Sequence, residues 1–146
     1  MQRIGSEVIA DSYMLQDVVV IGGGPAGAAT AICLAQRGVR VTIFDIRSRP
    51  TWKIGETLAP SAWPLLRALG VENRFMQEGH LRSYGSCSAW GEARIAEKDF
   101  IYHPDGCGWQ LDRARFELLL LRAAGDAGAR VRTERRDRDD TGRLRQ

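Results

Sequence analysis

The sequence predicts an α/β fold that starts with a β-α-β unit and passes through an inserted helical and antiparallel section into a further helix and strand. Two observations predict this order. Near the N-terminus, the β-branched run 18–21 ends in three glycines, and an alanine-rich helical pattern follows at once. Near the C-terminus, the amphipathic pattern 113–127 leads into a further strand-like run at 129–133. A doubly wound sheet needs more strands than these, so we expect the fold to be incomplete at its C-terminal end.

A glycine motif joins the first predicted strand to the predicted helix 26–37. Gly22, Gly24 and Gly27 have G-x-G-x-x-G spacing. In this spacing the first glycine allows the turn off the strand, the second lets the backbone approach a pyrophosphate, and the third lets the helix pack against the strand. Pro25 suits the first helical turn, where its missing N–H costs nothing. The N–H groups and the positive dipole end of the helix would then face the phosphates.

A carboxylate follows the second predicted strand, 40–44. Asp45 lies about 20 residues beyond the glycines, where an acid accepts hydrogen bonds from a ribose. An acid at this position favours an unphosphorylated adenosine ribose. The alternative is a glycine-rich turn in an ordinary α/β protein, with Asp45 as a solvated loop acid. Because strand, helix, second strand and acid occur in register, we favour dinucleotide binding.

The middle of the chain alternates short helices with short strands. The predicted elements are a loop at 46–55, a helix at 58–69, helical turns at 71–77, and antiparallel strands at 83–90, 93–96, 99–102 and 107–111. Asp112 is the expected N-cap of the helix 113–127. The run 129–133 then predicts a third parallel strand.

One nucleotide-binding domain is expected over residues 15–135, because 146 residues suffice for about one domain. Residues 1–14 show no periodicity and are expected to be disordered or appended, with Met14 as the natural start. Residues 136–146 are rich in charge, and we expect them to form a disordered tail.

Composition argues against several classes of partner. The net charge of +3 arises in residues 130–146, where seven arginines face four acids (7 − 4 = +3), so no clean basic face predicts nucleic acid binding. No apolar run approaches the roughly 20 residues of a membrane span, and no signal-peptide pattern is present. These features predict no membrane partner and a cytoplasmic location. The three cysteines lack C-x-x-C spacing and both histidines are isolated, so no metal site is predicted, and no catalytic residue is identified.

Three motifs together resemble a group of FAD-dependent oxidoreductases that includes p-hydroxybenzoate-hydroxylase-type monooxygenases and tryptophan halogenases. Besides the glycine unit, KIGETLAP at 53–60 resembles the Gly-Glu-x-x-x-Pro segment of halogenase-like flavoproteins. GWQLDRARF at 108–116 resembles the arginine-bearing start of their second long helix. Through 79–80 and 88–91 the likeness is closest to flavoproteins that help build peptide-derived quinone cofactors. It covers about residues 15–135, as an N-terminal portion only.

The resemblance implies a Rossmann-like FAD-binding domain and assigns roles to matching residues. The cofactor-binding positions are Gly22, Gly24, Pro25, Ala26 and Gly27 at the pyrophosphate, Asp45 at the adenosine ribose, Glu56 and Thr57 along the flavin, and Arg113 near the pyrophosphate. Without the resemblance, Glu56 would be an exposed acid at a helix N-cap and Arg113 part of a surface ion pair.

The resemblance also implies an activity. It indicates an FAD-dependent monooxygenase of a small-molecule or peptidyl aromatic substrate, with peptidyl tryptophan as one candidate and NAD(P)H or a flavin reductase as electron source. Halogenation is disfavoured, because halogenases carry a lysine after the second helix. No lysine lies here between Lys53 and Lys98, and Ser83 falls near that position. Two alternatives stay open: a truncated, catalytically inert nucleotide-binding fragment, and a flavin reductase of the geranylgeranyl-reductase kind.

Overall fold

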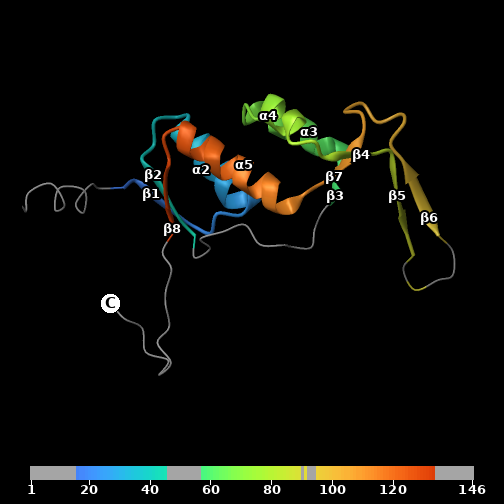
Figure 1. The fold of residues 1–146 in the computed structure, drawn as a ribbon, viewed down its shortest axis with the longest axis horizontal. Coiled ribbons are helices and arrows are strands. Elements are labelled where there is room, and N and C mark those ends of the chain that lie inside the picture. The colour runs from blue at the N-terminus through green and yellow to red at the C-terminus, as the bar shows by residue number, and fades with distance from the viewer. Residues whose placement is uncertain (1–15, 46–56, 90, 92–94, 134–146) are drawn as a thin grey trace, which may run out of the picture.

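A parallel three-stranded sheet forms one end of the molecule (Figure 1). The computed structural model describes residues 16–45, 57–89, 91 and 95–133. The sheet has the strand order β1–β2–β8, with β1 at Val18–Ile21, β2 at Val41–Asp45 and β8 at Arg130–Thr133. Val18 pairs with Val41, and Thr42 pairs with Arg130, both in parallel register. The third parallel strand predicted at 129–133 is therefore confirmed.

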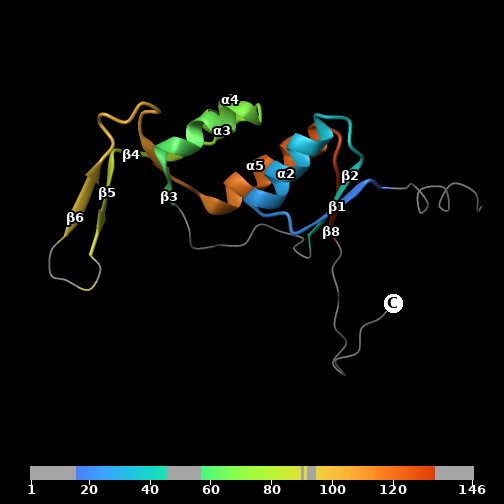
Figure 2. The ribbon, with the colours of Figure 1, turned by 180° about the vertical axis from the view of Figure 1, so that it is seen from behind.

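Two long helices, α2 (Pro25–Ala35) and α5 (Arg113–Asp126), lie side by side on one face of this sheet (Figures 1 and 2). Pro25 occupies the first turn of α2, and Gly38 follows its end with a φ of +78°. A left-handed residue of this kind is typical of a helix C-terminus. The arrangement confirms the predicted α/β, Rossmann-like class.

A small antiparallel sheet lies beyond the start of α5. Its order is β3–β7–β4, with β3 at Thr57–Leu58, β7 at Gly108–Gln110 and β4 at Leu81–Ser83. Between β3 and β4 the chain forms the 3-10 turn Pro60–Ala62 and the helices α3 (Trp63–Ala68) and α4 (Glu72–Gln77). The prediction of one helix over 58–69 was wrong at its start. Leu58 pairs with Trp109 in the sheet, and the helical turns begin only at Pro60.

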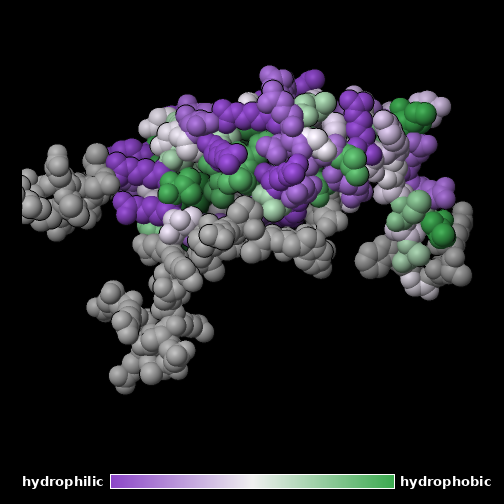
Figure 3. All heavy atoms as spheres, viewed as in Figure 1, coloured by the Kyte–Doolittle hydropathy of each residue, from purple (hydrophilic) through white to green (hydrophobic). Residues whose placement is uncertain are grey.

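A two-stranded hairpin, β5 (Gly85–Ser88) with β6 (Ala96–Asp99), extends away from the rest of the molecule (Figures 1 and 2). The prediction of a single strand over 83–90 was wrong, because Ser83 ends β4 and β5 belongs to a different sheet. The strand predicted at 99–102 was also wrong beyond Asp99. There the chain turns, and His103 N–H donates to the Phe100 carbonyl at 2.9 Å. Both hydrophilic and hydrophobic residues lie on the surface of the hairpin (Figure 3).

One apolar core joins the two sheets. Ile32 of α2, Ile43 of β2 and Leu120 of α5 are buried together. The same cluster continues to Phe75 of α4, whose ring meets that of Trp109 edge-on at 5.3 Å. Because α5 contacts α2, α4 and β8, this helix fixes the small sheet relative to the parallel sheet.

Some predictions lie outside the described residues. These are the loop 46–55, Glu56, the N-terminal segment 1–14 and the tail 136–146, and they stay predictions, as does the single-domain assignment over 15–135.

Candidate functional site

The turn between β1 and α2 begins with Gly22, whose φ is +101°. Side chains with a Cβ rarely adopt this backbone conformation, so glycine is required here. The Gly22 N–H donates to the Phe44 carbonyl of β2 at 2.7 Å. The turn is therefore tied to the neighbouring strand, as the glycine spacing predicts.

Asp45 supports this turn from the end of β2. Its side chain is buried, and its Oδ2 accepts a hydrogen bond from the Gly23 N–H at 3.1 Å. A Cβ on Gly23 would lie 2.6 Å from that oxygen, so Gly23 is required by a close approach. The structure thus assigns Asp45 a role within the fold that the sequence did not reveal. Gly23, the x between the first two motif glycines, becomes part of the site.

The start of α2 has no side-chain cap. Gly24 is its N-cap residue, with φ −71° and ψ 179°, and as a glycine it has no side chain that could cap the first turn. The first N–H groups of a helix have no partner within the helix. A Cβ on Gly24 would meet none of the described residues within 4 Å, so these residues leave the space beside this backbone open. The backbone N–H groups around Ala26 are therefore accessible to an anion.

Gly27 allows the close contact between helix and strand. A Cβ there would lie 2.0 Å from the Gly22 carbonyl oxygen and 3.2 Å from Cγ1 of Val20. Gly22 and Gly27 thus have the conformational and packing roles expected from the motif. The space next to Gly24, by contrast, is not filled by any of the described residues.

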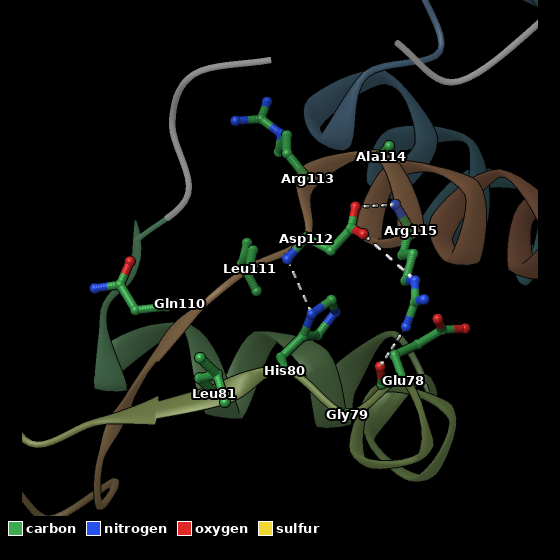
Figure 4. A pocket seen from close by; sticks show the side chains of 10 residues that line it. All are labelled: Glu78, Gly79, His80, Leu81, Gln110, Leu111, Asp112, Arg113, Ala114 and Arg115. Atoms are coloured by element: carbon green, nitrogen blue, oxygen red, sulfur yellow. Dashed lines mark hydrogen bonds and ion pairs between the residues drawn. The ribbon is translucent and has the colours of Figure 1, made fainter. Parts of the chain in front are cut away.

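The start of α5 is capped. The Asp112 carboxylate accepts from the Arg115 N–H at 3.0 Å, as expected for an N-cap. The guanidinium of Arg115 also pairs with Asp112 at 3.4 Å and donates to the Glu78 carbonyl at 3.4 Å (Figure 4). From the other side, the Asp112 N–H donates to Nδ1 of His80 at 3.2 Å. This corner is held by groups of the chain itself.

A cavity of about 630 Å³ lies beside this corner, and Arg113 and Gln110 are among its lining residues. In Figure 4 the Arg113 side chain extends away from His80, on the opposite side from Arg115. Its Nε lies 3.2 Å from Oε1 of Glu117, one helical turn later, and Glu117 is buried. A buried carboxylate therefore holds the guanidinium over the first turn of α5.

Thr57 lies on the same face of the small sheet as Gln110, its partner in β7. The Thr57 hydroxyl donates to Oε1 of Gln110 at 3.3 Å. Glu56, the preceding residue, lies outside the described residues. Thr57, predicted along the flavin, and Arg113, predicted near the pyrophosphate, are linked through Gln110, which bonds Thr57 and lines the same cavity as Arg113.

The two helix starts lie at the same edge of the parallel sheet. Both α2 and α5 run back against parallel strands, so both begin on the side where the strands end. Leu121 of α5 is next to the glycine turn, since a Cβ on Gly23 would lie 2.9 Å from its side chain. Arg113 lies eight residues earlier, or about 12 Å of helix at 1.5 Å per residue. The site is therefore elongated, with an open backbone cradle at one end and an arginine-lined cavity at the other.

Sequence reasoning missed four residues of this site: Gly23, His80, Gln110 and Glu117. The unbroken run of three glycines could have indicated Gly23. Glu117 follows Arg113 by four residues on a predicted helix, which is the spacing for an ion pair. His80 and Gln110 lie in segments that carry the family resemblance but were assigned no role there, because only the pairing of β4 with β7 shows that this part of the chain lies beside α5.

Comparison with known proteins assigns a family. The model of the FAD binding domain matches residues 16–141. The chain belongs to the FAD-binding domain family. The flavin-dependent halogenase armH3 of Armillaria mellea is 35% identical over 117 residues, which are 79% of this chain and 23% of that protein. The chain thus spans about a quarter of the length of this curated relative.

Solved structures with a similar fold support the same family assignment. The myxobacterial chondrochloren halogenase CndH superposes with a TM-score of 0.73 at 34% identity, covering 81% of this chain and 28% of that one. The p-nitrophenol 4-monooxygenase PnpA from Pseudomonas putida DLL-E4 shares the fold at a TM-score of 0.67 and 19% identity, covering 82% and 32%. The predicted resemblance to the halogenase and monooxygenase group is confirmed, and FAD is confirmed as the cofactor of this family.

The described residues fit FAD. The open space at Gly24 and the uncapped start of α2 leave room and N–H donors for a pyrophosphate. The elongated site has the form that a two-ended dinucleotide requires. Among the described residues no cluster of His, Cys, Asp and Glu could hold a metal ion. Within the same ranges, no helix is long and apolar enough to cross a bilayer.

Proposed function

We propose that the chain forms the FAD-binding portion of an oxidoreductase that acts on an aromatic substrate. The observation that carries the proposal is the open backbone at Gly24, set between a turn that requires glycine and a buried acid. The named activities of the relatives, halogenases and a p-nitrophenol monooxygenase, support an aromatic substrate.

The cradle at α2 would hold the ADP half of FAD. The backbone N–H groups of Gly24, Ala26 and Gly27 would face the pyrophosphate, with Pro25, which has no N–H, in the first helical turn and the helix dipole favouring the phosphate charge. Asp45 would accept hydrogen bonds from the adenosine ribose.

The start of α5 would hold the other half. Thr57 and Gln110 present polar groups there, Arg113 presents a forked cation held by Glu117, and Glu56 is assigned to the same region by its sequence motif. Bound flavin supplies the redox chemistry. The chain's own residues bind and orient it, and the cavity walls limit its exposure to water.

Two reaction types share this cofactor. The named activities of the relatives favour halogenation, whereas the lack of a lysine between Lys53 and Lys98 favours oxygen transfer, and we propose oxygen transfer. The more specific candidate substrate is a peptidyl tryptophan. NAD(P)H or a flavin reductase would supply the electrons, and the protein would act in the cytoplasm. A test incubates the chain with FAD, NADH, a tryptophan peptide and bromide, and identifies products by mass spectrometry. A brominated peptide would contradict oxygen transfer, whereas no product supports the alternative of a catalytically inert fragment.

FAD binding is tested by Gly24→Val. We expect titration with FAD or ADP to show at least about tenfold weaker binding, about 1.4 kcal/mol, because the side chain would fill the space that the pyrophosphate needs. The matched control is Gly125→Val, since Gly125 also has an open Cβ position but lies near the end of α5. If Gly24→Val binds FAD as tightly as the unaltered chain does, the backbone at Gly24 is not part of the FAD site.

A further inference from the structure

His80 lies where the small sheet meets the first turn of α5. Leu81, the next residue, begins β4 and pairs with Gln110 at the end of β7. Two residues after Gln110, the Asp112 N–H donates to Nδ1 of His80 at 3.2 Å (Figure 4). This bond therefore follows directly on the β4–β7 ladder and continues the link between the two segments up to the helix start.

The bond fixes which nitrogen of the His80 ring carries the proton. Because Nδ1 accepts, the neutral imidazole holds its proton on Nε2. Nε2 is buried and has no hydrogen-bond partner within the described part of the chain. The ring lies against Phe75, with centroids 4.9 Å apart, and edge-on to Phe116 at 6.4 Å. Among the described residues, the ring is thus held by packing and by one hydrogen bond, the one from Asp112.

Asp112 links His80 to Arg113, the first residue of α5. Its N–H is bonded to His80 and its carboxylate to the Arg115 N–H, so the residue is fixed on both sides as the helix begins. Arg113 lines the cavity and pairs, one helical turn later, with the buried Glu117. The position of Arg113 is therefore set by the bond to His80 at its backbone and by the ion pair at its guanidinium.

Protonation of His80 would break this arrangement. An imidazolium donates from both nitrogens, so its Nδ1–H would face the Asp112 N–H and the hydrogen bond would be lost. The charged groups that face the ring are the carboxylates of Glu78 and Asp112 and the guanidinium of Arg115. Burial outweighs the two carboxylates and lowers the pKa of His80 from its ordinary value of 6.5, so the neutral ring is the form held at neutral pH.

We propose that His80 is a positioning residue for the α5 end of the cofactor site. Its neutral ring holds Asp112, and through it Arg113, in place for the cofactor, and protonation of the ring releases this end of the site. Both histidines of the chain lie outside the glycine turn before α2, so that end keeps its form. The identity of the cofactor rests on the proposed function, but the link from His80 to Arg113 belongs to the free chain as well.

The first test measures the affinity for FAD as a function of pH. We expect the affinity to be full above about pH 6.5 and to fall at least about threefold between pH 7.5 and 5, because the neutral ring is the binding form. His80→Asn, whose Oδ1 is as far from Cβ as Nδ1 is, keeps an acceptor for Asp112 and should abolish the fall. His103→Asn, the matched control, should keep it.

Two further variants separate positioning from a general effect on the fold. His80→Leu removes the acceptor and should weaken FAD binding at pH 7.5, and His80→Asn should restore most of that loss. Arg113→Gln should bind FAD more weakly and should also lose the fall at acid pH, because His80 acts on the cofactor through Arg113. A histidine that only stabilised the fold would leave the fall in place in Arg113→Gln.

A second test needs no cofactor. NMR spectra of the free chain follow the ring nitrogens of His80 and the side chain of Arg113 over the same pH range. We expect the neutral ring to carry its proton on Nε2, and the Arg113 signals to shift as His80 is protonated. In His80→Asn the Arg113 signals should stay constant over this range.

Four results would overturn the proposal: a neutral ring protonated on Nδ1, no fall in FAD affinity at acid pH, or a fall that persists in His80→Asn or in Arg113→Gln. If the chain binds no FAD at any pH, the proposed function fails, and the spectra of the free chain decide the role of His80. Arg113 signals that ignore the protonation of His80 would then overturn the link between them.

Discussion

The helices α2 and α5 begin at the same edge of the parallel sheet, yet their first turns are satisfied in different ways. The first turn of α5 is closed by Asp112, which accepts from the Arg115 N–H. The first turn of α2 has Gly24 in the equivalent place and no side-chain cap. Both starts are needed for the fold, but only one is completed by the described chain.

This difference separates a structural helix start from a ligand-binding one. A capped start gains stability from its own sequence, typically about 1 kcal/mol. An uncapped glycine start forgoes that gain and keeps its donors for an anion. The loss of stability from the missing cap of α2 is limited, because the turn before it is held by two other hydrogen bonds. Gly23 N–H donates to Asp45, and Gly22 N–H donates to the β2 backbone.

The largest expected effect comes from making α2 begin as α5 does. Gly24→Asp would place a capping carboxylate over the free N–H groups and repel phosphate. We expect FAD and ADP to bind at least about 100-fold more weakly, about 2.7 kcal/mol. The unfolding free energy should stay within about 0.5 kcal/mol, because an acid is a good N-cap. Gly24→Ser, which caps the helix without adding charge, serves as the control. An undiminished FAD affinity in Gly24→Asp would show that the uncapped start of α2 is not the phosphate site.

The next effect concerns the acid that supports the open turn. Asp45→Ala removes a buried acceptor from the Gly23 N–H, and we expect unfolding in urea to show a loss of about 1.5–3 kcal/mol. Asp45→Asn keeps an oxygen for that bond and should retain most of the stability.

The same two variants test the ribose assignment. Both should weaken FAD and ADP, while FMN, which lacks the adenosine ribose, should be unaffected. An equal loss for FMN would indicate that Asp45 acts through folding alone.

A smaller effect is expected at the closed start. Asp112→Ala removes the cap of α5 and should lower the unfolding free energy by about 1 kcal/mol, measured by thermal or urea unfolding. Asp112→Asn should restore most of it, because an amide oxygen also caps a helix. If Asp112→Ala is as stable as the unaltered chain, the cap contributes nothing and the contrast with α2 loses its energetic basis.

The smallest effect is a pH dependence at the same corner. Burial lowers the pKa of His80 from its ordinary value of 6.5, with Glu78 and Asp112 partly opposing the shift. The folded chain therefore holds the neutral imidazole, whose Nδ1 accepts from the Asp112 N–H. Stability should be full above about pH 6.5 and decline as the pH falls below it, because the unfolded chain then binds the proton more readily.

His80→Gln keeps an acceptor for Asp112 and should flatten this decline in unfolding experiments between pH 7.5 and 5. His103→Gln is the matched control, because His103 belongs to the turn after the hairpin strand β6. A decline as steep in His80→Gln as in the unaltered chain would assign the pH dependence to other groups.

The fold could be predicted where its causes are local. The strand, glycine turn and helix at the N-terminus, the Asp112 cap and the parallel strand at 130–133 each follow from neighbouring residues. Predictions failed where pairing partners are distant. Leu58 looked like the start of a helix, but Trp109, some fifty residues later, draws it into a sheet.

The sequence by itself determined the β-α-β unit, the cofactor class, and Gly22 and Gly27 as positions that require glycine, because motif spacing and turn conformation are properties of nearby residues. Only the tertiary structure decided that Asp45 is bonded to Gly23, that Glu117 is buried while it holds Arg113, and that Arg82 lies over the Trp109 ring. These contacts depend on burial and on the register between strands. Both are set by the packing of the whole chain against α5, and no short stretch of sequence contains that information.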